Sequence, residues 1–256
     1  MDAVFAKAKN NSTNPYIFEF DNNLVKEISG STFSNQFDAT KFDSKKLLPD
    51  KVKNEGFFIV HLGKGKQAFV KGEGYHKFEF IPTKISLEAS YNVISKLGES
   101  ESSTSSELFN YKIIHDFLGL SDKSDLFVHT ARRTRVTYDF IVDPDIHLKA
   151  ISLQIEIDAF FETLNEIITV EVKNVDREDF EIRQLFSAMK YMESKIKSGV
   201  IPEKYVIRHL FVVRQKVNDG YIFRIYEYVF TDKDRLNSIK LIKSVEYLVH
   251  FHDILS

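Results

Sequence analysis

The sequence predicts an α+β protein with an α/β core, in which a mixed central sheet carries flanking helices. From Lys149 onward, strand, turn, strand, helix, strand and hairpin patterns follow one another, which is typical of a sheet with a helix on one face. Before them, short runs of aromatic and β-branched residues separated by Gly predict a β-rich N-terminal region. We expect regions 1–145 and 146–256 to form separate parts.

The elements of the first region are predicted from local composition. Four short strands are expected at YIFEF, GFFIVHLG, QAFV and YHKFEF. A helix is predicted over residues 86–98, and the Ser-rich residues 99–107 are expected to form an exposed loop or linker. The apolar spacing in residues 108–118 predicts an amphipathic helix, and a basic hairpin follows it. A helix followed by a hairpin resembles a winged helix.

Composition excludes several kinds of chemistry. The chain has no cysteine, so disulfides, thiolate zinc sites and a cysteine nucleophile are excluded. It has no run of about 18 apolar residues and no signal-peptide pattern, so no membrane partner is expected and a cytoplasmic location is predicted. Its 35 basic and 37 acidic residues give a net charge of -2, which does not by itself indicate a phosphate-rich partner.

The stretch IEIDAFFETLNEIITVEVKN predicts a hairpin with one charged side. If TLNE forms a four-residue loop, counting outward places Asp158 opposite Glu171 and Glu156 opposite Lys173. Because side chains alternate along a strand, all four lie on one side of the sheet.

The other side of this hairpin is uniformly apolar. It is expected to pack on the stripe of Ile182, Phe186 and Met189 in the following helix. The apolar residues are Ile155, Ile157, Ala159, Phe161, Ile168, Val170 and Val172.

The charged side has two interpretations. An ordinary half-exposed hairpin would simply leave these charges in solvent. However, directly opposed carboxylates repel, and Asp158 opposite Glu171 calls for more positive charge than Lys173 supplies. Two carboxylates suit Mg²⁺, because they leave other coordination positions of the ion open, and Mg²⁺ often binds phosphate there. Phosphodiester hydrolysis is therefore expected, with Lys173 assisting the attacking water or offsetting charge on the phosphate.

These residues resemble the signature of the PD-(D/E)XK nuclease superfamily. Asp158 is followed on the adjoining strand by the triplet Glu171-Val172-Lys173, and Ile157 stands at the proline position. A helix follows the triplet and carries Gln184, which the resemblance directs toward the site. On spacing alone, Gln184 could equally be a surface residue.

The last 110 or so residues resemble a group of type II restriction endonucleases. This resemblance implies a mixed sheet of the PD-(D/E)XK nuclease type, Mg²⁺-dependent cleavage of double-stranded DNA at a short sequence, and a cognate methyltransferase. It leaves open whether the chain acts as a homodimer on two-fold symmetric DNA. A structure-selective DNA repair nuclease on the same core and a non-catalytic DNA-binding protein are the alternatives.

Two basic segments are candidates for DNA contact, and a solvated turn is the alternative for the first. Arg132, Arg133 and Arg135 lie among threonines on the predicted hairpin, where arginine suits phosphate contacts and the reading of guanine. Glu156 is expected to support the site, as a partner of Lys173 or as a further metal ligand. The second segment is Gly-rich and offers Lys64, Lys66 and Lys71.

Overall fold

The computed structural model describes residues 1–30, 38–90, 100–121, 125–129, 131–218 and 220–252. It is a mixed α/β structure built around a seven-stranded sheet with the strand order β5-β14-β13-β12-β10-β9-β6. The sheet is mixed, as predicted, because β10 and β12 are parallel, as are β14 and β5, while the other neighbours are antiparallel. None of the described helices is long and apolar enough to cross a membrane.

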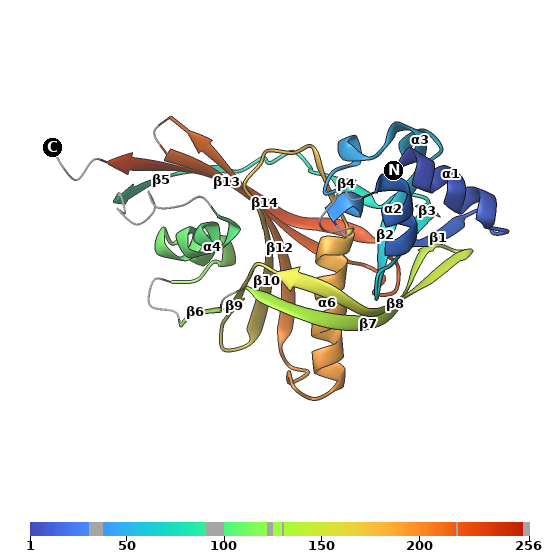
Figure 1. Ribbon diagram of the computed structural model, residues 1–256. Helices are drawn as coiled ribbons and strands as arrows, with labels where there is room; N and C mark the ends of the chain where they lie inside the picture. The colour runs from blue at the N-terminus through green and yellow to red at the C-terminus, as the bar shows by residue number, and fades with distance from the viewer. Residues whose placement is uncertain (31–37, 91–99, 122–124, 130, 219, 253–256) are drawn as a thin grey trace.

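The N-terminal part contains helices as well as the predicted strands (Figure 1). Its elements are α1 (Asp2–Asn11), β1 (Ile17–Asp21), α2 (Asn22–Ser29), α3 (Asp50–Asn54), β2 (Phe57–Gly63), β3 (Lys66–Lys71) and β4 (Tyr75–Lys77), with short 3-10 turns at Asp38–Thr40 and Lys45–Leu47. Strands β1, β3 and β2 form a three-stranded sheet. Aromatic rings fill its core, where Phe5 packs edge-on against Phe18, Phe57 and Phe69.

The rest of the chain supplies the large sheet, its helices and a long hairpin. The elements are β5 (Lys84–Ser90), α4 (Glu101–Asn110), α5 (Ile113–Leu118), β6 (Phe127–His129), β7 (Arg132–Asp143), β8 (Ile146–Ile157), β9 (Ala159–Glu162), β10 (Glu166–Lys173), β11 (Asp179–Glu181), α6 (Arg183–Lys197), β12 (Val206–Val217), β13 (Gly220–Phe230) and β14 (Ile239–His252). Strands β7 and β8 form a two-stranded sheet, and β11 pairs with β4. The expected boundary at residues 145 and 146 lies in the turn between β7 and β8.

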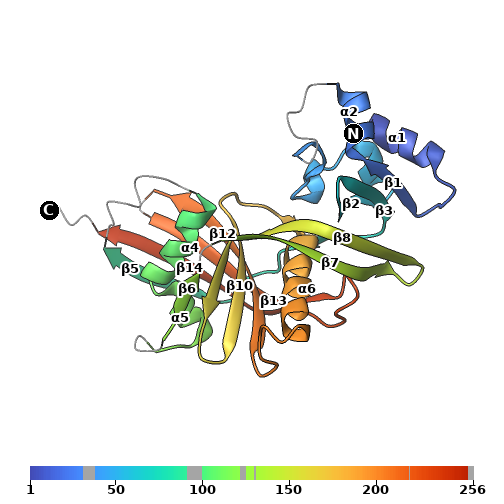
Figure 2. The same ribbon diagram turned by 60° about the horizontal axis from the view of Figure 1, so that its bottom comes forward.

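Helices cover both faces of the large sheet. Helix α6 packs in one core cluster with Phe211 of β12 and Tyr226 of β13. The opposite face, with Val170 and Val172 of β10, packs on α4 and α5 in a second cluster. In Figure 2, α6 lies beneath the β7–β8 hairpin, which extends from the large sheet toward the N-terminal strands. The face of β10 that carries Glu171 and Lys173 therefore lies on the α6 side.

The predicted hairpin register is confirmed for β9 and β10, and it ends at Asp158. Phe161 lies opposite Ile168 and Ala159 opposite Val170, as counting from the loop predicts. Beyond Asp158 the chain leaves this pairing, because β8 pairs with β7 and places Glu156 opposite Arg133. The prediction that Glu156 faces Lys173 is therefore wrong.

The predicted packing of the apolar side is correct only in part. Ile155 and Ile157 share a core cluster with Ile182, Phe186 and Met189 of α6. The break at Asp158 separates them from the apolar residues of β9 and β10, which face α4 and α5 instead: Ala159, Phe161, Ile168, Val170 and Val172.

Three predictions between residues 84 and 157 need correction. Residues 84–90 form strand β5, paired with β14, rather than the start of a helix, and residues 91–98 of that predicted helix lie outside the described residues. Within the Ser-rich segment, residues 101–107 lie in α4 and do not form a loop. The predicted winged-helix arrangement is wrong as well, because α5 and the β7–β8 hairpin belong to different core clusters.

Candidate active site

Five side chains predicted from the sequence line one cavity of about 180 Å³. The cavity lies where β8 passes into β9, between the end of β10 and the first turns of α6. The five residues are Glu156, Asp158, Glu171, Lys173 and Gln184. The lining also includes Lys41, Glu101, Gln154, Ile155, Arg183 and Ser187.

Asp158 is fixed at the break between β8 and β9 by two hydrogen bonds. Its backbone N–H donates to Val170 O (3.2 Å), and its Oδ2 accepts from the backbone N–H of Val172 (2.8 Å). Burial raises the pKa of the Asp158 carboxyl, although Lys173 and the Val172 N–H act in the opposite direction. The carboxylate is thus held in a defined position, and the positive charge around it is too small to offset the cost of burying its ionised form.

Glu171 and Lys173 alternate with inward-facing apolar residues on β10 and form a buried ion pair. Lys173 Nζ lies 2.8 Å from Glu171 Oε1, and the two residues are 6% and 8% exposed, respectively. Burial, reinforced by Asp158, outweighs the attraction of Lys173 and raises the pKa of Glu171 to about 7. Burial alone would lower the pKa of Lys173, but Glu171, Asp158 and Glu101 together raise it. Lys173 is therefore a permanent cation in this cavity.

Gln184 on the first turn of α6 points into the site, as the resemblance implied. Its Nε2 donates to Glu171 Oε1 (2.7 Å). Its Oε1 is buried and has no hydrogen-bond partner among the described residues. A buried amide oxygen without a donor is costly, so it marks a position where a water or ligand donor would be stabilised.

Glu101 is a fourth acidic residue at the site and was missed by sequence reasoning. It lies in the first turn of α4, where Ser100 caps the helix by accepting from the Ser103 N–H. Its carboxylate is 3.1 Å from Lys173 Nζ and is 44% exposed. Ser100 followed by an acidic residue is a capping pattern that could have indicated the helix start, but no local pattern indicates the contact with Lys173.

Glu156 lies at the edge of the cavity rather than beside Lys173. It forms a salt bridge of 3.1 Å with Arg133, and both side chains are more than half exposed. An exposed pair of this kind is worth about 0–1 kcal/mol. Glu156 still acts on the site, because its charge contributes to the raised pKa of Asp158.

The residues present fit a Mg²⁺ ion bound by few protein ligands. In the part of the chain that the structure describes, no group of three or more His, Cys, Asp or Glu side chains is arranged to hold a metal. Mg²⁺, however, commonly uses one or two carboxylates and takes its remaining oxygens from water and substrate phosphate. Asp158 and Glu171 supply the two carboxylates, and the unpaired Gln184 Oε1 can accept from a metal-bound water.

The six predicted DNA-contacting residues divide among different places. Lys64, Lys66 and Arg135 come together around a second cavity of about 420 Å³, which shares Gln154 with the acidic one. Among the described residues these three cations form no ion pair. Lys71 lies outside this cavity, and its Nζ donates to the backbone carbonyl of Glu55.

The hairpin arginines lie on β7, and the turn of the hairpin lies elsewhere, between β7 and β8. Arg133 pairs with Glu156 at the edge of the acidic cavity. Arg132 lines a third cavity.

The second cavity, called the basic cavity below, is brought close to the acidic cavity because β2 and β8 pack together at Gly63. Gly63 has a φ of +87°, and a Cβ at this position would lie 2.1 Å from Ile151 O.

Comparison with known proteins places the chain in a family. Residues 1–69 match a family model described as a domain of unknown function (DUF6996), and residues 67–248 match one described as a domain of unknown function (DUF6997). The two matches meet in β3. No curated protein and no solved structure matches the chain. Since the second match covers more than half of the chain and includes every residue of the acidic cavity except Lys41, the chain belongs to the DUF6997 family.

Proposed function

We propose that this chain is a sequence-specific endonuclease of the type II restriction class, which hydrolyses phosphodiester bonds of double-stranded DNA with Mg²⁺. The observation that carries the proposal is the placement of the half-buried Asp158 and the buried Glu171 in one cavity with Lys173. The pKa values of both carboxyls are raised, so the site is short of positive charge at neutral pH. A divalent cation resolves this shortage and also catalyses phosphodiester hydrolysis.

Each side chain has a defined part in the proposed reaction. Asp158 and Glu171 would hold the Mg²⁺ ion, which polarises the scissile phosphate and lowers the pKa of a bound water. Lys173 remains protonated and offsets the negative charge that grows on the phosphoryl oxygens. Gln184 keeps Glu171 in place through its amide and offers its free Oε1 to the attacking water. Glu101 of α4 holds the Lys173 ammonium through its ion pair.

Cations flank the acidic cavity where a DNA backbone would continue. The neighbouring cavity carries Lys64, Lys66 and Arg135, which together supply three positive charges without nearby ion-pair partners among the described residues. Such charges gain affinity by releasing counterions from phosphates. The net charge of -2 therefore conceals a local basic surface next to the site.

A structure-selective DNA repair nuclease would use the same acidic cavity, and the fragment pattern distinguishes the two. The protein is incubated with varied plasmid and genomic DNA in Mg²⁺, and the products are separated by size. Discrete fragments support restriction, with a methyltransferase that modifies the same sequence as its functional partner. Cleavage confined to branched or single-stranded DNA supports the repair nuclease.

A non-catalytic DNA-binding protein is the third candidate, since the Lys173–Glu171 pair could be a structural salt bridge. Calorimetric titration with Mg²⁺ separates this case. Mg²⁺ binding that is lost in Glu171→Gln supports the nuclease, and absence of Mg²⁺ binding in the wild type supports the non-catalytic protein.

A further inference from the structure

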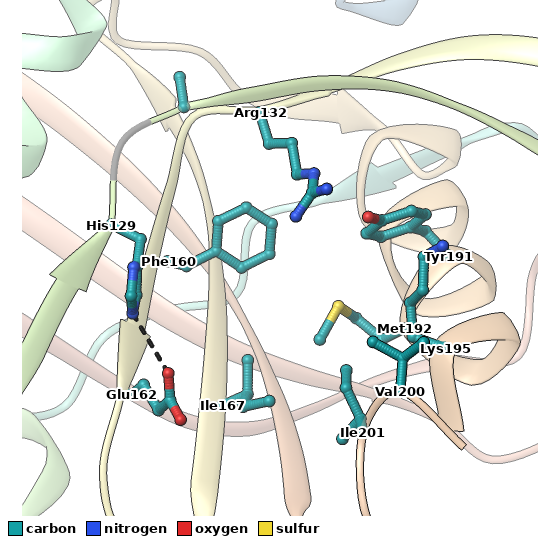
Figure 3. A pocket seen from close by; sticks show the side chains of 11 residues that line it. His129, Arg132, Phe160, Glu162, Ile167, Tyr191, Met192, Lys195, Val200 and Ile201 are labelled. Carbon is teal, nitrogen blue, oxygen red and sulfur yellow. Dashed lines mark hydrogen bonds and ion pairs between the residues drawn. The ribbon is translucent and has the colours of Figure 1, made fainter. Parts of the chain in front are cut away.

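A third cavity has a volume of about 540 Å³ and shares β10 and α6 with the acidic cavity. It is enclosed by the start of β7, by β9 and β10, and by the second half of α6 (Figure 3). Its lining is His129, Ala131, Arg132, Phe160, Glu162, Ile167, Tyr191, Met192, Lys195, Val200 and Ile201.

The cavity has aromatic walls and a basic edge. Figure 3 shows Phe160 and Tyr191 on opposite sides of the opening, with the Arg132 guanidinium extending between them and Met192 below. The Arg132 guanidinium lies 5.9 Å and Lys195 Nζ 5.2 Å from the centre of the Tyr191 ring. Among the described residues neither cation forms an ion pair.

The acidic side chain in the cavity, Glu162, already has a partner. His129 Nε2 lies 3.2 Å from Glu162 Oε2, which leaves Arg132 and Lys195 to an incoming anion. A flat apolar slot beside two unpaired cations suits a planar ring attached to a phosphate. Stacking between aromatic rings and cation–π contacts are the interactions that hold single bases of nucleic acids.

The position of the cavity ties it to the acidic site. Phe160 on β9 follows Asp158 by two residues, a separation of about 7 Å in extended chain. Tyr191 follows Gln184 by seven residues on α6, two turns or about 10 Å. A strand whose phosphate lies between Asp158 and Glu171 would therefore have an adjacent base within reach of the slot.

We propose that this aromatic cavity receives one base turned out of the DNA duplex beside the scissile phosphate. The inference rests on the proposed function, because it assumes that DNA occupies the acidic site. Enzymes that turn out a base recover the cost of unstacking by stacking that base in a fitted pocket. The volume lies within the range of pockets that bind small ligands, roughly 300–1,000 Å³, and leaves room for the base and its sugar.

Binding to mispaired DNA tests this proposal. Two pools of short duplexes with random flanks are compared in Ca²⁺, one fully paired and one with a central mispair, because a mispaired base costs less to turn out. The wild type is expected to bind the mispaired pool more tightly. Phe160→Leu keeps an apolar side chain but removes the ring, and it is expected to lose this preference and to weaken binding to mispaired DNA roughly 5- to 150-fold.

A matched control and a second measurement make the test decisive. Phe80 is 84% exposed and lies outside the cavity, so Phe80→Leu should retain the preference. A 5-iodouracil at the mispair, irradiated in the wild-type complex, should crosslink to a peptide containing Phe160 or Tyr191.

The possible outcomes separate this proposal from the proposed function. Equal affinity of the wild type for the two pools, a preference that survives in Phe160→Leu, or crosslinks only outside the cavity would overturn the base pocket while leaving DNA binding intact. Failure of the wild type to bind either pool would instead refute the proposed function, and the base pocket with it.

Discussion

The amide of Gln184 on α6 donates a 2.7 Å hydrogen bond to the carboxylate of Glu171 on β10. This bond joins the helix to the central sheet at the cavity that Asp158 and Glu171 line. It also fixes the Gln184 side chain so that its Oε1 stays buried without a donor. The pair thus combines a positioned carboxylate with an open acceptor, which is the arrangement that a bound water beside a metal needs.

Replacing Gln184 should reduce catalysis more than stability. Gln184→Ala removes a donor that favours the ionised form of Glu171, so the pKa of Glu171 should rise further. Outer-shell partners of metal ligands are typically worth 10- to 100-fold in metal affinity or activity, and we expect a loss of roughly that size in cleavage rate. A pH–rate profile checks the cause: the rising limb should move to higher pH. An unchanged profile would show that the bond does not control Glu171.

Without metal, Glu171 should make the protein less stable as the pH rises toward neutrality. Its pKa is about 7 in the folded protein against 4.5 for an ordinary Glu. The folded state therefore keeps a proton that the unfolded chain has released, and this contribution is complete below pH 4.5 and is lost as pH rises through about 7. Between these values the wild type should lose about 3 kcal/mol of unfolding free energy relative to Glu171→Gln.

Urea unfolding at a series of pH values, with and without Mg²⁺, measures this effect. A bound cation favours the ionised carboxylate, so Mg²⁺ should flatten the wild-type pH dependence and leave Glu171→Gln unchanged. Parallel stability curves for the two proteins without Mg²⁺ would contradict the raised pKa of Glu171.

Lys173 should be essential for cleavage and dispensable for DNA binding. Lys173→Met keeps the length of the side chain but removes the charge beside the phosphate, and we expect cleavage to fall roughly 100- to 1,000-fold, as when one stabilising group is removed from a transition state. Lys190→Met is a matched control, because Lys190 is also a buried lysine, paired with Asp234 at 2.6 Å away from the site. It should lose stability but cleave within a few-fold of the wild type once folded. Comparable loss in both variants would mean that Lys173 is only structural.

The basic cavity should control the salt dependence of DNA binding. Each phosphate contact contributes about 0.9 to the slope of log K against log salt. The double variant Lys66→Gln/Arg135→Gln should therefore lower the slope by roughly 1.8 if both cations contact phosphates. Lys149→Gln is the control, since Lys149 pairs with Asp139 on the exposed face of the hairpin. Equal slopes in the double variant and the control would place the DNA elsewhere.

Local sequence patterns predicted the part of the site that the hairpin of β9 and β10 forms. The loop between β9 and β10 is closed by Thr163, whose backbone N–H donates to Glu166 O, and counting from this loop gave the correct register. Alternation along β10 then placed Glu171 and Lys173 on one side. Gln184 came from the resemblance rather than from spacing, and the structure brings it to the same cavity.

The remaining features depend on a change of strand partner and on a contact between distant segments. Glu156 was misplaced because β8 pairs with β7 across the turn at residues 144–145, so counting from the loop between β9 and β10 no longer applies beyond Asp158. The Ser-rich helix α4 was read as a loop because serine is a weak helix former. Its stability comes instead from packing and from the buried pair between Glu107 and Arg214 of β12, at 2.8 Å. That helix carries Glu101 to Lys173.

Cleavage by Asp158→Asn tests the central claim most directly. Asparagine keeps an oxygen that can accept from the Val172 N–H, so the fold should survive while the negative charge that would hold Mg²⁺ is lost. Asp139→Asn is the matched control, because Asp139 lies on the exposed face of β7, paired only with Lys149 among the described residues. On mixed genomic DNA with Mg²⁺, the wild type and Asp139→Asn should produce the same fragments and Asp158→Asn none. Fragments from Asp158→Asn at the wild-type rate, or no cleavage by the wild type, would contradict the claim that this cavity is a metal-dependent nuclease site.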